Sequence, residues 1–149
     1  MSDNQLSKNM GQLPVARGTL SSLIQLLLRG GLAGIFWSSA RTKVEGMLTV
    51  SENTTYLFAE EYRVPILSPE FAAHLATYAE HLLPLLLIAG LGTRFAALGL
   101  LVMTLVIQIF VYPNALLSTH LGWMALAAAI MVYGPGRFAV DHLLVGRRP

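Results

Sequence analysis

Two charged residues lie deep inside apolar stretches of the sequence, and both carry side chains that can do chemistry. Arg29 stands in LIQLLLRGGLAGIFW, residues 23–37, and Glu80 stands in the apolar segment that begins near residue 70. A lone charge at the centre of a membrane helix costs about 2.5–3.5 kcal/mol on insertion scales. Arginine binds a carboxylate through two hydrogen bonds, so we expect Arg29 and Glu80 to form a buried ion pair.

The depths of the two residues agree with this pairing. If antiparallel helices begin near Leu20 and end near Leu91, Arg29 and Glu80 lie about 14 and 16 Å from the same membrane face, at 1.5 Å per residue. Such a pair has two interpretations. It either clamps two helices together and specifies their arrangement, or it forms the floor of a functional polar cavity.

Further polar side chains are expected above this pair. His74 and His81 are seven residues apart and share a helix face, and His120 and Trp123 share a face because they are three apart. With Gln108 and Tyr112 they predict a polar pocket that opens toward the outer side of the membrane. The candidate catalytic residues are Glu80, Arg29 and His120, and the candidate cofactor-binding residues are Arg29, His81, Gln108, His120 and Trp123.

A metal site is a separate alternative, because imidazole binds copper, zinc and iron. His74, His81 and His120 would supply the ligands, but no short two-histidine signature supports this, and we assign no metal ligands. The chain contains no cysteine, which excludes thiol redox chemistry and thiolate metal sites within it. In any redox work the electrons must therefore pass through a bound cofactor or a partner.

Four apolar segments position these residues, at about 20–40, 70–91, 95–112 and 118–133. Hydrophobic residues make up 54% of the 149 residues and charged residues 12%, whereas about a quarter of a soluble protein is charged. Short connections imply antiparallel neighbours. We therefore predict an all-α, integral membrane four-helix bundle in a single domain, 1–149, with a polar tail at 1–18. Arg29 and the length of the first segment argue against a cleaved signal peptide.

The long connection, residues 41–69, is expected to hold an amphipathic helix at the membrane interface. A mainly apolar set recurs at helix-like spacing, and acidic residues fill much of the other side; the two sets are Met47, Val50, Thr54, Leu57 and Phe58, and Glu45, Glu52, Glu60 and Glu61. A solvated loop is the alternative.

Basic residues near the segment ends predict the orientation. Most lie on the side of the two termini, namely Lys8, Arg17, Arg94, Arg137, Arg147 and Arg148, against Arg41, Lys43 and Arg63 on the other side. The positive-inside rule then places both termini in the cytoplasm. The basic residues form no stripe, so we expect the lipid bilayer as partner and no nucleic acid.

The chain resembles the DoxX family of small membrane proteins. The residues that carry the resemblance run from about Leu23 to Asp141: Arg29-Gly-Gly with Ile35-Phe36 and Lys43, then Glu80 and GLGTR at 90–94, then YPN at 112–114, His120, Trp123 and GPGRFAVD at 134–141. The resemblance implies four spans in a bacterial inner membrane. Family members include a subunit of a thiosulfate:quinone oxidoreductase and proteins linked with superoxide dismutase and sulfurtransferase partners.

Two functions follow from the resemblance. The first is a quinone-linked subunit of a membrane redox or stress-response system, working with a soluble or membrane redox partner. The second is a non-catalytic anchor or assembly partner for a soluble or secreted protein. Residues 62–67 and 107–113, YRVPIL and IQIFVYP, resemble the branch encoded beside peptide-modifying iron enzymes and metal-stress operons, which would place that anchor in metal homeostasis. A small transporter fits less well, because no inverted repeat is apparent. Self-association into a homo-oligomer is left open.

Overall fold

The computed structural model describes residues 3–62 and 64–145, and the side chains within 18–62 and 64–144. Most of the described chain is helical. The elements are α1 (Asp3–Arg41), β1 (Val44–Glu45), β2 (Thr49–Val50), α2 (Glu52–Leu57), η1 (Phe58–Tyr62), α3 (Pro69–Ala89), α4 (Thr93–Val106), η2 (Ile107–Val111), η3 (Pro113–Ala115), η4 (Leu116–His120), α5 (Leu121–Tyr133) and α6 (Val140–Val145).

Four of the helical stretches are long and apolar enough to cross a membrane, which confirms the predicted fold class. They are Gly18–Arg41, Pro69–Ala89, Thr93–Val111 and Pro113–Tyr133. Many large apolar side chains on them point away from the protein, such as Phe95 with 81% of its surface exposed and Leu117 with 83%. Exposed apolar area of this extent is unfavourable in water and is expected on a lipid-facing surface.

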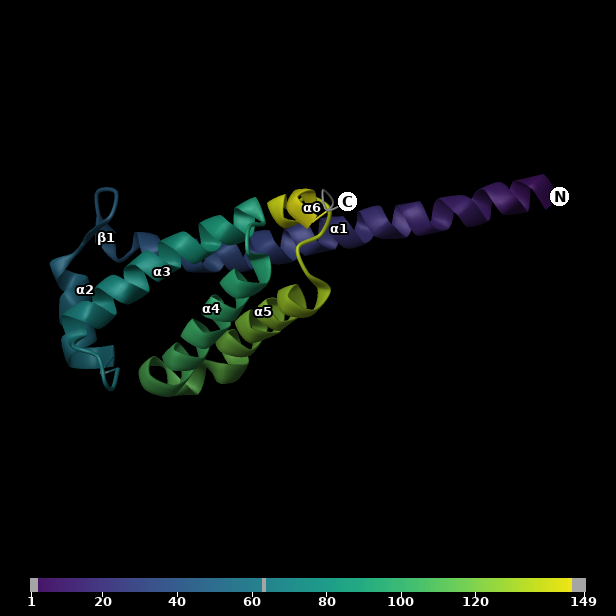
Figure 1. Ribbon diagram of the computed structural model, residues 1–149. Helices are drawn as coiled ribbons and strands as arrows, with labels where there is room; N and C mark the ends of the chain where they lie inside the picture. Colours follow the sequence, from purple (N-terminus) through teal and green to yellow (C-terminus); the bar gives the residue numbers. More distant parts are fainter. Residues whose placement is uncertain (1–2, 63, 146–149) are drawn as a thin grey trace.

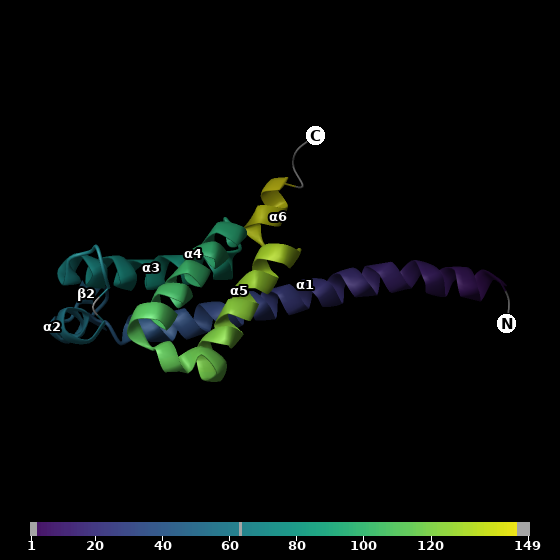
Figure 2. The same cartoon turned by 90° about the horizontal axis from the view of Figure 1, so that it is seen from below.

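The helices pack as two antiparallel pairs. α1 lies along α3, α4 lies along α5, and the N-terminal part of α1 extends beyond the other helices (Figures 1 and 2). The main core lies where the four helices meet and contains Leu32, Ala33, Phe36, Leu87, Ala96, Ala97, Leu100, Ala127 and Ile130. The hairpin and α2 lie at one end of the bundle, and α6 lies at the other (Figure 1).

The connection between the first two spans differs in part from the predicted amphipathic helix. β1 and β2 form a short antiparallel hairpin, with Val44 opposite Val50, so Met47 and Val50 lie in the hairpin and not on a helix. The helix begins only after Ser51, whose hydroxyl accepts a hydrogen bond from the N–H of Thr54 at 3.2 Å. The serine caps the helix and so sets its start. Phe58, directly after α2, then packs against Ala72 and Ala73 of α3.

At the opposite end, α6 caps α4 from a distant part of the sequence. The Asp141 carboxylate accepts hydrogen bonds from the N–H groups of Gly92 at 2.8 Å and Thr93 at 2.9 Å. These groups begin α4, where free N–H groups and the helix dipole favour a negative charge. Partial burial opposes ionisation, but these hydrogen bonds and the charge of Arg29 outweigh it and hold the pKa of Asp141 below its ordinary value.

Candidate functional site

Arg29 does not pair with Glu80, and this prediction is wrong. Its guanidinium donates to the carbonyl oxygens of Leu87 and Ile88, both at 2.7 Å, and of Pro135 and Phe138, at 2.8 and 3.0 Å. Leu87 and Ile88 lie in the last turn of α3, where carbonyls have few helical partners and the dipole favours a cation. The Leu87 oxygen also accepts from the Gly90 N–H at 3.1 Å. Arg29 therefore clamps α1 to the end of α3 and to the segment after α5.

Glu80 pairs with Lys43 instead. The Lys43 Nζ lies 2.8 Å from Glu80 Oε2 and also donates to the Ser39 hydroxyl at 2.8 Å. Both charged side chains are largely buried, with 15% of Lys43 and 3% of Glu80 exposed. A buried carboxylate needs a cation and hydrogen bonds to offset its loss of water, and Lys43 with Ser39 supplies both.

The register between α1 and α3 explains the change of partner. Arg29 lies level with Leu87 and Ile88, near the end of α3. Glu80, in the middle of α3, lies level with Ser39, near the end of α1. The expected pairing requires Leu20 of the first helix to lie level with Leu91 of the second, but α1 continues toward the N-terminus past that point. The true alignment is shifted by several residues, about 10 Å at 1.5 Å per residue, which separates Arg29 from Glu80.

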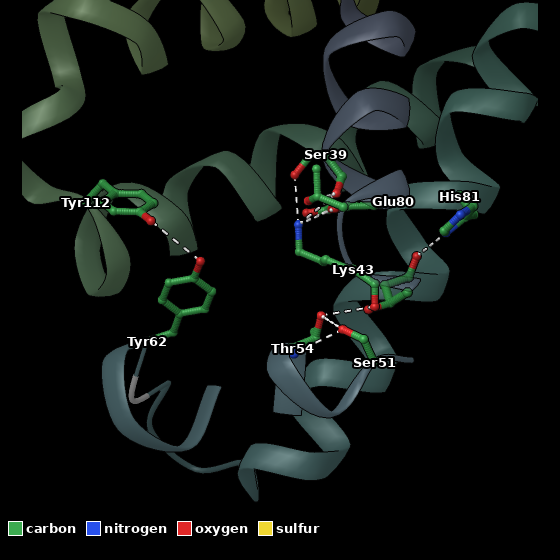
Figure 3. A network of polar contacts seen from close by, with 10 residues as sticks. Ser39, Lys43, Ser51, Thr54, Tyr62, Glu80, His81 and Tyr112 are labelled. Atoms are coloured by element: carbon green, nitrogen blue, oxygen red, sulfur yellow. Dashed lines mark hydrogen bonds and ion pairs between the residues drawn. The ribbon is translucent and has the colours of Figure 1, made fainter. Parts of the chain in front are cut away.

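The segment after α1 holds Lys43 in place (Figure 3). The Lys43 carbonyl accepts hydrogen bonds from the Ser51 N–H and the Thr54 hydroxyl, each at 3.0 Å. The Ser51 and Thr54 hydroxyls lie 2.9 Å apart. Thus the same residues that cap α2 also fix the backbone of Lys43, and the ammonium group is directed back toward α1 and Glu80.

The Lys43–Glu80 pair lines a cavity of about 170 Å³ between the spans. Most of its wall is apolar and includes Phe36, Phe58, Met103 and Trp123. The polar side chains that reach it are Ser39, Lys43, Tyr62, Glu80, Tyr112 and His120. Ligand pockets typically combine an apolar wall with a few polar groups that fix orientation, and this cavity has that composition.

His120 lines this cavity, and one of its ring nitrogens binds Gln108. Its Nδ1 lies 2.6 Å from Gln108 Oε1, and the Gln108 amide nitrogen donates to the Pro113 carbonyl at 2.6 Å. Because the amide nitrogen is committed to Pro113, the amide oxygen faces the ring and Nδ1 carries the proton. The hydrogen bond with Gln108 uses Nδ1, which leaves Nε2 of a neutral His120 as a hydrogen-bond acceptor, and only 2% of the residue is exposed.

Three π-helical segments meet at the same cavity. η1 contributes Phe58 and Tyr62, η2 contributes Ile107 and Val111, and η4 contributes His120. π-Helical turns are rare and occur often at functional sites, because the extra residue redirects side chains.

Two tyrosines meet at the edge of the cavity, where the Tyr62 and Tyr112 hydroxyls lie 3.5 Å apart (Figure 3). Burial raises the pKa of Tyr62, and the hydrogen bond with Tyr112 adds to this effect, so the phenol stays neutral at pH 7.

The remaining predicted site residues lie elsewhere. His81 packs its ring on Trp37, with ring centroids 5.3 Å apart, and donates to or accepts from the Thr77 carbonyl, outside the cavity. His74 bonds the Glu70 carbonyl on its own helix. Among the described residues no three histidine or acidic side chains gather as metal ligands. His74, His81 and His120 therefore do not form the alternative metal site.

Of the predicted site residues, Glu80, His120 and Trp123 line the cavity and Gln108 binds His120, whereas Lys43 and Tyr62 also line it and were not predicted. Lys43 lies just beyond the first apolar segment, so it was counted as a surface charge on the outer side. One signal was available. A lysine at the C-terminal end of a helix folds back along it readily, because its long stem follows apolar surface while the ammonium group seeks an acceptor.

Residues 24–113 match the family model described as DoxX, which is more than half of the chain. The chain belongs to the DoxX family. This confirms the resemblance seen in the sequence, and the match includes Arg29, Lys43, Glu80 and Gln108. No curated protein and no solved structure matches the chain.

Proposed function

We propose that this DoxX-family protein binds the head group of a membrane quinone in the cavity, as the quinone-linked subunit of a redox or stress-response system of the bacterial inner membrane. One observation carries the proposal: a mostly apolar cavity of about 170 Å³ has the His120 imidazole in its wall, with Nδ1 of that ring bound to Gln108. An apolar cavity of about 150 Å³ holds a benzene ring in another protein. The space therefore suits a single six-membered ring with oxygen substituents.

The polar wall suits both redox forms of such a ring, the quinone and the quinol. Neutral His120 accepts a hydrogen bond at Nε2 from a quinol hydroxyl, and protonated His120 donates one to a quinone oxygen. Gln108 keeps the proton of the neutral ring on Nδ1. Glu80, with Lys43 against it, is placed to hold or release a proton at the cavity wall. Electrons come from a partner redox protein or a bound cofactor, since the chain has no thiol.

The cavity belongs to the outer half of the membrane in the proposed orientation. It lies beside η1, at the end of the bundle away from α6. Arg94, between the second and third spans, and Arg137, after the fourth span, lie at the α6 end and favour the cytoplasm for that end. Quinone chemistry would then take place near the outer leaflet, within reach of an external partner.

Trp123 supplies the test, because it lines the cavity and its ring centroid lies 5.1 Å from that of His120. The chain has two tryptophans, and Trp37→Phe leaves Trp123 as the fluorophore. Titration of this variant in lipid nanodiscs with ubiquinone-1 should quench the fluorescence to saturation. His120→Phe should weaken the binding about tenfold, the effect of losing one buried hydrogen bond.

His74→Phe is the matched control, since it makes the same change outside the cavity and should leave the binding unchanged. Quenching that rises linearly with quinone, without saturation, would overturn the proposal. Equal binding by the His120→Phe and His74→Phe variants would remove His120 from the site.

A further inference from the structure

An apolar groove of about 440 Å³ runs between α3 and α4 on the outer surface of the bundle. Leu75, Ala79 and Leu83 line it from α3, and Gly99 and Val102 line it from α4. Leu75 and Val102 each leave about half of their surface exposed, at 51%. Both helices are candidate membrane spans, so the open side of the groove faces the hydrocarbon of the bilayer.

The groove adjoins the cavity. Five residues line both spaces, namely Phe58, Val64, Ala76, Met103 and Val106. Each of these five residues is buried or half-buried. The two spaces therefore meet at one shared wall, one side of which contacts the lipid-facing groove and the other the space beside His120.

Two of the five side chains in the shared wall, Ala76 and Met103, can make room for a ligand. Ala76 is small, and Met103 has three rotatable bonds, so its thioether adapts to the shape of a neighbour. On the groove side, Gly99 has no side chain, and a Cβ there would lie 2.8 Å from Leu83 Cδ1. The close approach of the two helices at Gly99 forms the floor of the groove, while Ala79 leaves room beside it.

We propose that the groove holds the hydrocarbon tail of the quinone, and that the ligand reaches the cavity from the bilayer between α3 and α4. The inference rests on the proposed function and specifies its substrate class as a lipid with a ring head group and a long isoprenoid chain. The groove has the apolar lining and the bilayer-facing opening that such a tail requires. The adjoining cavity is lined by the buried His120 ring, whose Nε2 supplies the hydrogen-bonding group that the head group requires.

The experiment compares two quinones in the Trp37→Phe background. One is ubiquinone-8, and the other is a tail-free ubiquinone with the same ring. Ala79→Phe fills the groove without touching the cavity, and Val102→Trp fills it from the exposed face of α4, where a large side chain is tolerated. A parallel titration of a Val102→Trp, Trp123→Phe variant measures the fluorescence of the added tryptophan alone, and this signal is subtracted. Ala125→Phe, on the exposed face of α5, is the matched control.

We expect both groove variants to weaken binding of the long-tailed quinone about tenfold or more, since overlap with a buried chain is strongly unfavourable. Binding of the tail-free quinone should stay unchanged, which also shows that the variants fold. The Ala125→Phe variant should bind both quinones as the Trp37→Phe parent does. If the groove variants bind the long-tailed quinone normally, the groove is not the tail site, although the proposed function stands. If the parent binds neither quinone, the proposed function itself fails.

Discussion

Lys43 is the residue on which the charge balance of the cavity depends, because its ammonium group lies against the Glu80 carboxylate. Removing one partner of a buried ion pair leaves the other charge uncompensated, which costs about 3–5 kcal/mol. Replacing both partners by neutral groups of similar size is far less costly. The pair therefore makes a clear prediction about single and double variants.

Lys43→Met should lower the free energy of unfolding by about 3 kcal/mol, because Glu80 is then buried without its cation. Adding Glu80→Gln in the same chain should recover most of this loss. Thermal unfolding in detergent, followed by circular dichroism, measures both effects. Losses that simply add in the double variant would show that Lys43 and Glu80 do not interact. Glu80→Gln should not recover the stability lost by an Arg29→Met variant, because Arg29 binds carbonyl groups and not Glu80.

The sequence predicted that Glu80 would be buried and paired, since a carboxylate in an apolar segment has few other options. It did not predict the partner. Arg29 and Lys43 were both available cations, and the choice depends on how α1 slides along α3. That register follows from many apolar contacts and from the carbonyls that bind Arg29, none of which is visible in residue spacing.

Helix ends are the elements that hold the bundle together at the side opposite the cavity. Arg29 binds the end of α3, and Asp141 binds the start of α4. Gly90 ends α3 in a left-handed conformation, with φ of 70°, which glycine adopts without strain. These contacts join α1, α3, α4 and α6 around one short turn, so this turn should be sensitive to the charge of Asp141.

Asp141 predicts a specific pH dependence of stability. Its pKa is lowered in the folded chain, so its contribution is complete above the unfolded pKa of about 3.9 and is lost as the pH falls through the lower folded value. Asp141→Ala should reduce the free energy of unfolding by about 0.5–2 kcal/mol at pH 7, the usual value of a helix cap. The loss should shrink below about pH 4.

Unfolding midpoints of both proteins between pH 3 and pH 7 provide the measurement. A difference between wild type and Asp141→Ala that stays constant across this range would contradict the account. Asp141→Asn serves as the control, since it keeps one acceptor oxygen for the two N–H groups and should lie between the two proteins at pH 7.

Elements with simple periodicity were predicted well, and elements that depend on local detail were not. The four spans follow from length and apolar composition. The hairpin before Ser51 and the π-helical turns do not, because a single extra residue in a turn leaves no periodic signal. Those turns direct Tyr62 and His120 into the cavity, so the details of the site came from the structure.

The helix bundle has the hairpin at one end and α6 at the other, and the N-terminal part of α1 extends beyond α6 (Figure 1). The proposed orientation places the hairpin outside the cell and α6 in the cytoplasm. Because the chain contains no cysteine, single cysteines can report this without background. Met47, 84% exposed at the hairpin, and Leu144, 55% exposed on α6, are suitable positions.

Met47→Cys should react with a membrane-impermeant maleimide in spheroplasts, and Leu144→Cys should react only after the membrane is permeabilised. Gel-shift labelling measures both reactions. The reverse pattern would place the cavity at the cytoplasmic side and move the proposed partner with it. Phe36→Cys, a position 1% exposed, is the control and should stay unlabelled in both conditions.

The most direct test of the central claim is the quinone that remains bound to the protein on purification. Wild-type protein extracted from bacterial membranes with a mild detergent should retain quinone at close to one molecule per chain, measured by solvent extraction and chromatography. His120→Phe should lose most of it, whereas His74→Phe should retain it. Wild type with no more quinone than His120→Phe would contradict a quinone site in this cavity.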